Sequence, residues 1–269
     1  MTQCGRAVLA STLVCLASTW TFGGPIEVTR YDFDDHVVGD RNISFGQSPI
    51  KEVFTKVGDG FGVYQVGVSD PLPGQFLDET LTFPSDDIGV VNSHPTSGKL
   101  DAWFGAVDLF VNPDNPSGTG TAIWEFDVSD FTDLSVSIDM AAMGAFIDTG
   151  YGHPHSYNWT WSIDGSPAAA LFTSSIDADG SLAYTMANGD VETYDAPLLM
   201  NGSVLNNTFQ TMSATVPDSG YVLTLTLNAE GDGHYAVFVF DDLVITGVPE
   251  PATLTLLTLG ALLTLRRRR

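Results

Sequence analysis

Residues 25–247 alternate between apolar and polar side chains with a period of two. The pattern is clearest in the stretches "AIWEFDV" (122–128), "DLSVSIDM" (133–140) and "YVLTLTLN" (221–228). Such alternation places the apolar side chains on one face of a strand and is typical of half-buried antiparallel strands. Turn-forming segments such as "NPDNPSG" (112–118) separate these runs. The pattern therefore favours strands over helices throughout this region.

These runs predict one all-β domain over residues 25–247. A body of about 220 residues is long enough to bury a single large core. We expect an antiparallel β-sandwich of about ten strands that is jelly-roll-like in character. The order of the strands cannot be read from the sequence.

The predicted body is strongly acidic. The whole chain of 269 residues has a net charge of −23, but residues 25–247 contain five basic and 32 acidic side chains, a net charge of −27. A surface this negative repels the phosphates of DNA and RNA, which excludes a nucleic-acid partner.

The N-terminus has the features of a secretory signal. Arg6 precedes an apolar run over residues 7–17, and Ala17 and Gly23 are alternative small residues at the cleavage position. We expect a signal peptide, in the form of a signal helix, over residues 1–24; the alternative is a buried helix of the mature domain. Both cysteines lie in this leader, so the mature protein is expected to have no disulfide.

The C-terminal segment, residues 248–269, is predicted to be a transient membrane anchor. Its apolar run, residues 252–265, is expected to form a short hydrophobic helix of about 21 Å, less than the ~20 residues of a comfortable span. Terminal arginines favour the cytoplasmic side, which places the body outside the inner membrane. The alternative, a core strand, does not explain the arginines. The residues that mark this segment are Val248, Pro249, Glu250 and Pro251 at its start and Arg266, Arg267, Arg268 and Arg269 at its end.

The order and position of these residues resemble the PEP-CTERM sorting signal of Gram-negative bacteria. The resemblance implies that exosortase, an integral-membrane enzyme similar to cysteine transpeptidases, processes the chain near Pro249, Glu250 and Pro251. It also implies export through the inner membrane, transient anchoring there, and delivery to the cell surface or the extracellular space. Proteins with this signal are typically linked to exopolysaccharide and biofilm formation.

The two ends of the body carry a second resemblance. The stretches "RYDFDD" (30–35) and "AVFVFDDLVITG" (236–247) are similar to the first and last strands of secreted jelly-roll modules of the carbohydrate-binding type. Several such families hold a structural calcium ion between these strands. Calcium prefers six to eight oxygen ligands, several of them carboxylates. If the terminal strands pair, the expected ligands are Asp32, Asp34, Asp35, Asp241 and Asp242; the alternative is that these residues are simply solvated.

Three aromatic residues in "SYNWTWSI" are candidates for contact with a sugar. Tyr157, Trp159 and Trp161 are two residues apart and share one strand face with Ile163. An exposed face of this kind stacks against sugar rings, whereas a buried face packs in the core of the sandwich. The core is the favoured interpretation, because tryptophan is largely buried on average.

No motif in the sequence predicts an enzyme. A serine hydrolase motif of the G-x-S-x-G type is absent, and no pair of acidic residues is singled out for glycoside hydrolysis. We therefore predict a non-catalytic, exosortase-sorted surface or matrix protein associated with exopolysaccharide or biofilm. The alternatives are a dedicated carbohydrate-binding module and a polysaccharide-acting enzyme.

Overall fold

A computed structural model describes most of the acidic body of the protein. The expected signal helix, apart from Gly24, and the expected hydrophobic helix of the tail lie outside the described residues, as does Asp35. No helix in the described part of the chain is long and apolar enough to cross a membrane. The described residues are 24–34, 41–56, 58–69, 72–78, 89–92, 102–147, 155–233 and 236–250.

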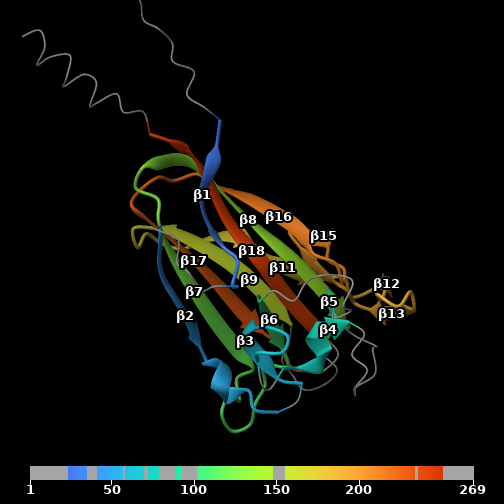
Figure 1. The fold of residues 1–269 in the computed structure, drawn as a ribbon. Coiled ribbons are helices and arrows are strands. Elements are labelled where there is room, and N and C mark those ends of the chain that lie inside the picture. The colour runs from blue at the N-terminus through green and yellow to red at the C-terminus, as the bar shows by residue number, and fades with distance from the viewer. Residues whose placement is uncertain are drawn as a thin grey trace, which may run out of the picture.

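Two antiparallel sheets face each other and form a sandwich (Figure 1). The six-stranded sheet, here called sheet A, has the order β16–β8–β18–β6–β3, and β1 pairs with β18 beside this path. Its strands are β1 (Ile26–Tyr31), β3 (Gly60–Tyr64), β6 (Trp103–Val107), β8 (Phe131–Gly144), β16 (Gln210–Val216) and β18 (Ala236–Pro249). The sandwich predicted from the period of two is thus confirmed.

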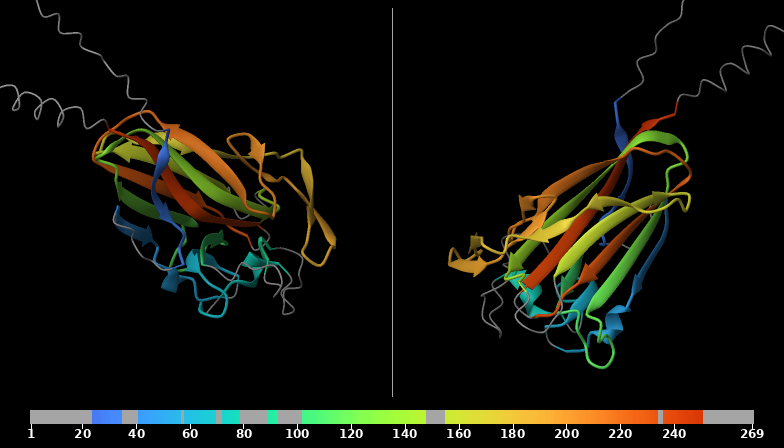
Figure 2. Two further views of the ribbon diagram at one scale, coloured as in Figure 1. Left: turned by 45° about the horizontal axis from the view of Figure 1, so that its top comes forward. Right: turned by 180° about the vertical axis from the view of Figure 1, so that it is seen from behind.

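The five-stranded sheet, here called sheet B, has the order β10–β9–β17–β7–β2. Its inner side chains are the apolar members of the alternating runs, and its outer side chains are mostly threonine, serine and asparagine. Figure 2 shows the strands of both sheets from two further directions. The strands of sheet B are β2 (Asn42–Ser48), β7 (Thr119–Asp127), β9 (Ser156–Ile163), β10 (Ala169–Phe172) and β17 (Val222–Glu230).

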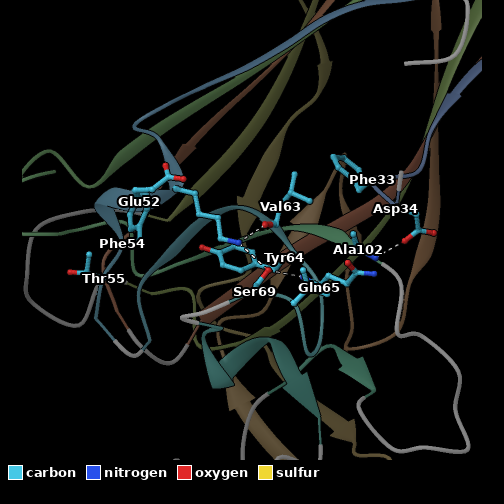
Figure 3. A pocket seen from close by; sticks show the side chains of 12 residues that line it. Phe33, Asp34, Glu52, Phe54, Thr55, Val63, Tyr64, Gln65, Ser69 and Ala102 are labelled. Atoms are coloured by element: carbon cyan, nitrogen blue, oxygen red, sulfur yellow. Dashed lines mark hydrogen bonds between the residues drawn. The ribbon is translucent and has the colours of Figure 1, made fainter. Parts of the chain in front are cut away.

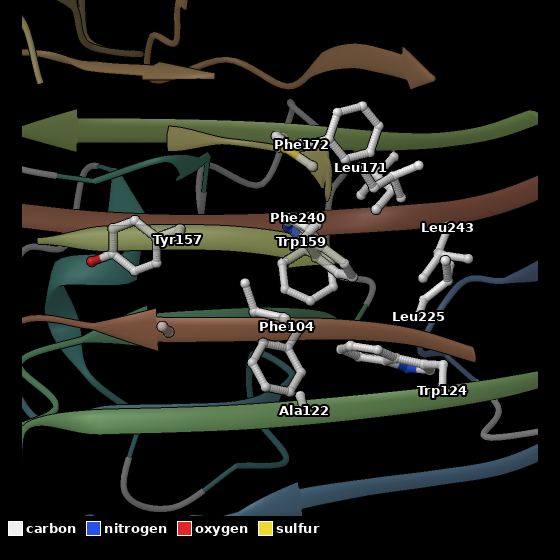
Figure 4. Packing of buried hydrophobic residues seen from close by; sticks show 14 of the residues in the cluster. Phe104, Ala122, Trp124, Tyr157, Trp159, Leu171, Phe172, Leu225, Phe240 and Leu243 are labelled. Carbon is white, nitrogen blue, oxygen red and sulfur yellow. The ribbon is translucent and has the colours of Figure 1, made fainter. Parts of the chain in front are cut away.

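The core between the sheets is rich in aromatic rings (Figure 4). Phe104 and Phe240 of sheet A stack with their ring centroids 4.9 Å apart. Trp159 of sheet B meets Phe240 edge to face at 4.8 Å. Offset and edge-to-face contacts are the favoured geometries for aromatic pairs, and each adds to the free energy gained by burial. The sandwich is therefore stabilised by a dry core without any disulfide.

A second layer of apolar side chains covers the outer face of sheet A. Trp103, which points away from the main core, packs with Tyr64 and Phe76 and with residues of the β12–β13 hairpin such as Tyr184. Sheet A is consequently buried on both faces, a feature that the sequence prediction did not include. The elements outside the two main sheets are η1 (Lys51–Val53), η2 (Gly74–Phe76), β4 (Leu77–Asp78), β5 (Val91–Asn92), β11 (Ser174–Ile176), β12 (Ser181–Thr185), β13 (Val191–Asp195), β14 (Leu198–Met200) and β15 (Ser203–Val204).

Candidate functional site

The long strand β18 carries the chain from the core directly into the C-terminal segment. One side of β18 pairs with β8 from Ala236 to Pro249. The other side pairs first with β6 and then, from Leu243 to Gly247, with β1. The end of β18 is therefore held between two neighbouring strands. We call residues 247–250 and their partners on β8 and β1 the sorting junction.

Backbone pairing extends into the proline-containing motif. Val248 pairs with Thr132, and Pro249 pairs with Phe131. The Glu250 N–H donates a hydrogen bond of 2.8 Å to the carbonyl of Asp130. Pro249 has no N–H to donate, and because β1 pairs with β18 only as far as Gly247, Pro249 lies at a local edge that tolerates this loss. The motif thus begins as part of the folded sandwich.

Gly247 allows the strand to make this approach. The pairing register shifts between Thr246 and Val248, so Gly247 occupies a bulge. A Cβ atom on Gly247 would lie 2.9 Å from Cδ2 of Leu134 and 3.1 Å from Cβ of Phe131. A larger residue would push the end of β18 away from β8.

Arg41 braces the partner strand at the same end. Its Nη2 lies 2.7 Å from Oδ2 of Asp130, and its guanidinium lies 4.7 Å from the centroid of the Phe131 ring. Arg41 also reaches the carboxylate of Asp127 at 3.9 Å. The pKa of Asp127 is lowered, first by hydrogen bonds from Ser129 and also by the charge of Arg41. These contacts fix the turn that presents Phe131 to Pro249.

Both ends of the described body meet at the sorting junction. Ile26, at the start of β1, pairs with Gly247. The blue start of β1 and the red end of β18 accordingly lie side by side at the top of Figure 1. A leader before residue 25 and a tail after residue 250 therefore leave the sandwich from one end.

The boundary expected between residues 247 and 248 falls inside β18. Val248 and Pro249 are strand residues, and Glu250 is hydrogen-bonded to the body. Of the sorting-signal residues, Pro251 and Arg266 to Arg269 lie outside the described residues. The folded body thus continues through Glu250.

Of the expected calcium ligands, Asp32, Asp34, Asp241 and Asp242 are described and lie in or next to the paired strands β1 and β18. Asp242 of β18 forms an ion pair with Arg30 of β1, with Nη1 and Oδ1 2.7 Å apart. The hydrogen bonds that Arg30 donates to Glu27 and then to Asp242 raise the pKa of Arg30. Asp241 is buried, and its Oδ1 accepts the Asp242 N–H at 2.7 Å. The guanidinium of Arg30 therefore already neutralises part of this acidic cluster.

Asp32 and Asp34 have protein partners as well. Oδ1 of Asp34 accepts the Ala102 N–H at 2.6 Å, and Oδ1 of Asp32 lies 3.4 Å from the Asp34 N–H. Within the described ranges, no three His, Cys, Asp or Glu side chains are grouped so that they could hold a metal ion. Calcium binding stays a prediction.

The three candidate sugar-stacking residues lie in the core. Trp159 is fully buried, and Tyr157 and Trp161 are 1% and 7% exposed. Tyr157 stacks on Phe238 of sheet A with the ring centroids 4.5 Å apart. Rings packed between the sheets offer no face to a ligand, so the platform interpretation is wrong for these residues, and the core interpretation is correct.

A pocket of about 540 Å³ opens beside η1 and the end of β3 (Figure 3). Nζ of Lys51 donates to the carbonyl of Val63 at 2.8 Å and to Oγ of Ser69 at 3.0 Å. The same ammonium lies 4.2 Å from the centroid of the Tyr64 ring. Burial lowers the pKa of Lys51, and the charge of Glu52 opposes this shift. The sequence offered no motif for this pocket, because its residues come from separate segments.

The pocket has the size and chemistry of a small-ligand site. Pockets of about 300–1,000 Å³ hold small molecules in many proteins. Lys51 and Gln65 supply hydrogen-bond donors, Glu52 supplies a carboxylate, and Val68 supplies an apolar rim. Strand β3 and η1 lie at the lower end of Figure 1, whereas the sorting junction lies at the top. The pocket is therefore at the end of the sandwich remote from the tail.

Comparison with known proteins identifies the C-terminal segment. Residues 247–269 match the family model described as the PEP-CTERM protein-sorting motif. No curated protein matches the chain. Among solved structures, the chain is similar to the K3 cleaved adhesin domain of Lys-gingipain from Porphyromonas gingivalis W83, with 13% identity, coverage of 83% of this chain and 99% of that one, and a TM-score of 0.37.

A second similar structure is the CBM22-1 xylan-binding domain of Xyn10C from Paenibacillus barcinonensis, with 9% identity, coverage of 83% of this chain and 96% of that one, and a TM-score of 0.30. The matched segment begins at Gly247, inside strand β18. This motif implies export and processing by exosortase. The chain thus carries, as a continuation of its central strand, a PEP-CTERM protein-sorting motif at residues 247–269.

Proposed function

We propose that the protein is a non-catalytic component of the cell surface or extracellular matrix of a Gram-negative bacterium, where it associates with the exopolysaccharide of a biofilm. One observation carries the proposal: the sorting motif is continuous with β18, the central strand of sheet A. The sorting machinery therefore acts on the whole acidic sandwich. The sandwich itself is the delivered part.

The charge of the body supports association with a polysaccharide through cations. A net charge of −27 over residues 25–247 repels anionic polymers unless cations lie between the two. Calcium accepts carboxylates from both sides, so it is the proposed bridge to acidic sugars. We retain a structural calcium ion between β1 and β18 as part of this proposal.

Delivery is tested by deleting residues 251–269, which leaves β18 intact. We expect the truncated protein to keep the melting temperature of the full chain but to disappear from the surface and matrix fractions. A truncated protein that still reaches the surface at the wild-type level would contradict the sorting proposal. The matched control is the Lys56→Ala variant of the full chain, because Lys56 is exposed on the body.

A specific observation favours a second candidate function, recognition of a saccharide in the pocket near Lys51. Two of the three N–H donors of Lys51 bind the carbonyl of Val63 and Oγ of Ser69. These bonds orient the ammonium and leave its third N–H for a ligand. We expect Lys51→Met to weaken retention of the protein in a gel containing the extracted polysaccharide, with Lys56→Met as the control. Equal retention of both variants would show that the pocket near Lys51 does not bind the polysaccharide.

A further inference from the structure

The sorting motif and the folded body overlap by four residues. The motif begins at Gly247, yet the chain stays in the sheet through Pro249 and hydrogen-bonded through Glu250. A processing enzyme can cleave only a peptide bond that its active site can reach. Bonds inside a sheet become accessible only when the local structure opens.

Opening this part of the sheet disrupts contacts on both sides of β18. Gly247 would have to leave Ile26, and Val248 and Pro249 would have to leave Thr132 and Phe131. Gly247 is paired on both sides, whereas Val248 and Pro249 are held by β8 and by the hydrogen bond of Glu250 to Asp130.

We propose that the sandwich sets the N-terminal limit of processing: exosortase acts at the Glu250–Pro251 bond or beyond it, and the mature protein keeps Val248, Pro249 and Glu250. This inference rests on the proposed function, because it requires that the tail is processed. It assigns the sorting junction the role of a protecting clamp.

The cleaved bond is an ordinary peptide bond. A nucleophile of the enzyme attacks the carbonyl carbon, the C–N bond breaks, and the amine of the C-terminal fragment leaves with a proton. Water then releases the body as a carboxylate, or an acceptor amine takes its place and forms a new amide. In both cases the new C-terminal group lies beside Glu250 and near Ile26, at one end of the sandwich.

The proposed N-terminal limit of processing lies close in the sequence to the predicted membrane segment. Pro251 alone separates Glu250 from the apolar run that starts at residue 252. One extended residue spans about 3.5 Å. The clamp therefore leaves little chain for the enzyme between the folded body and the apolar run. The mass of the mature protein shows where in this short stretch processing occurs.

The first experiment determines the C-terminal residue of the delivered protein by mass spectrometry. We expect it to be Glu250 or a later residue. A mature protein that ends before Glu250 would overturn the inference. A delivered protein that still ends at Arg269 would count against the proposed function, and the second experiment then decides the inference by itself.

The second experiment measures amide hydrogen exchange in the purified full-length chain by mass spectrometry. We expect slow exchange of the Glu250 amide, which donates to the carbonyl of Asp130. Arg41→Met removes the ion pair with Asp130 and the contact with Phe131, and it should speed exchange of the Glu250 amide several-fold.

Arg30→Met is the matched control, because Arg30 is also a paired arginine but contacts Glu27 and Asp242 instead. We expect its exchange rate at the Glu250 amide to equal that of the wild type. Rapid exchange of this amide in the wild type, or equal rates in the Arg41→Met variant and the wild type, would show that the fold does not protect the motif.

Discussion

Trp124 of β7 stacks on Trp159 of β9, with ring centroids 5.3 Å apart and planes inclined by 26°. The two strands are not neighbours, since β17 lies between them. Their side chains meet beneath β17 because both point into the core, where Phe240 of the opposite sheet contacts both rings. This aromatic cluster links the two sheets at the centre of the sandwich.

Replacing Trp159 tests the assignment of this residue to the core. Large-to-small substitutions of buried aromatic residues cost about 3–5 kcal/mol. We expect Trp159→Ala to lower the free energy of unfolding by about this amount, as measured by urea denaturation of the purified precursor. Tyr221→Ala, at a side chain that is 72% exposed, is the control and should change stability little. A Trp159→Ala variant as stable as the wild type would contradict the core assignment.

A second prediction concerns the layer outside sheet A. A Cβ atom on Gly105 would lie 2.5 Å from the Phe76 ring, so glycine is required for Phe76 to cover this face. We expect Gly105→Ala to destabilise the protein by about 1–3 kcal/mol through overpacking. Gly46→Ala has nothing within 4 Å of the new Cβ and is the control. Thermal denaturation of both variants compares the two sites.

If the ring of Phe76 is the cause, then Phe76→Leu should cost less in the Gly105→Ala background than in the wild type. Such coupling is expected for residues in direct contact. Strictly additive effects of the two substitutions would show that Gly105 is needed for another reason.

The second layer explains which part of the fold was predictable. Alternating runs such as residues 221–228 predicted strands with one buried face, and β17 has this pattern. The runs Ala236–Phe240 and 140–143 are continuously apolar, a pattern that accompanies burial of both faces, but the sequence prediction did not include this burial and the runs do not show what covers the second face. The covering residues, such as Phe76 and Tyr184, come from distant segments whose own sequences lack a strong period.

A third prediction uses pH. Burial raises the pKa of Tyr157, and the charge of Asp108 adds to the shift. The folded protein therefore holds this proton more tightly than the unfolded chain, whose tyrosines titrate at about pH 10. The stability that Tyr157 contributes is present below pH 10 and is lost as the pH rises from there toward the folded pKa.

We expect the melting temperature to fall between about pH 9 and 11, and Tyr157→Phe should reduce the fall. Tyr221→Phe, at an exposed position, is the control and should leave the pH dependence unchanged. A fall of equal size in the wild type and Tyr157→Phe would remove Tyr157 from this explanation. Tyr64, whose pKa is also raised by burial, would then be the next residue to replace.

The sorting junction shows where prediction from the sequence ended. The resemblance of the tail to the sorting signal placed the boundary before Val248. The structure places Pro249 at the last paired position of β18. Pairing of the terminal strands was only a condition of the calcium hypothesis, and the ion pair between Arg30 and Asp242 was not predicted. Spacing in the sequence does not show which neighbour a carboxylate will meet across a sheet.

The last prediction tests calcium at the paired terminal strands. Asp242 has a φ of 48°, a conformation that asparagine adopts more readily than alanine, so Asp242→Asn removes the charge without added backbone strain. We expect calcium to raise the melting temperature of the wild type relative to chelator, and Asp242→Asn to abolish the rise. Arg30→Met frees the Asp242 carboxylate and should increase the response to calcium.

In chelator, both variants lose the ion pair between Arg30 and Asp242, and Arg30→Met also loses the one between Arg30 and Glu27. The side chains are 42% and 31% exposed in the first pair and 42% and 50% exposed in the second, and each such pair contributes less than about 1 kcal/mol. Both variants should therefore melt only slightly below the wild type without calcium. If the wild type and Arg30→Met each melt at the same temperature in calcium and in chelator, calcium has no structural role at the paired terminal strands.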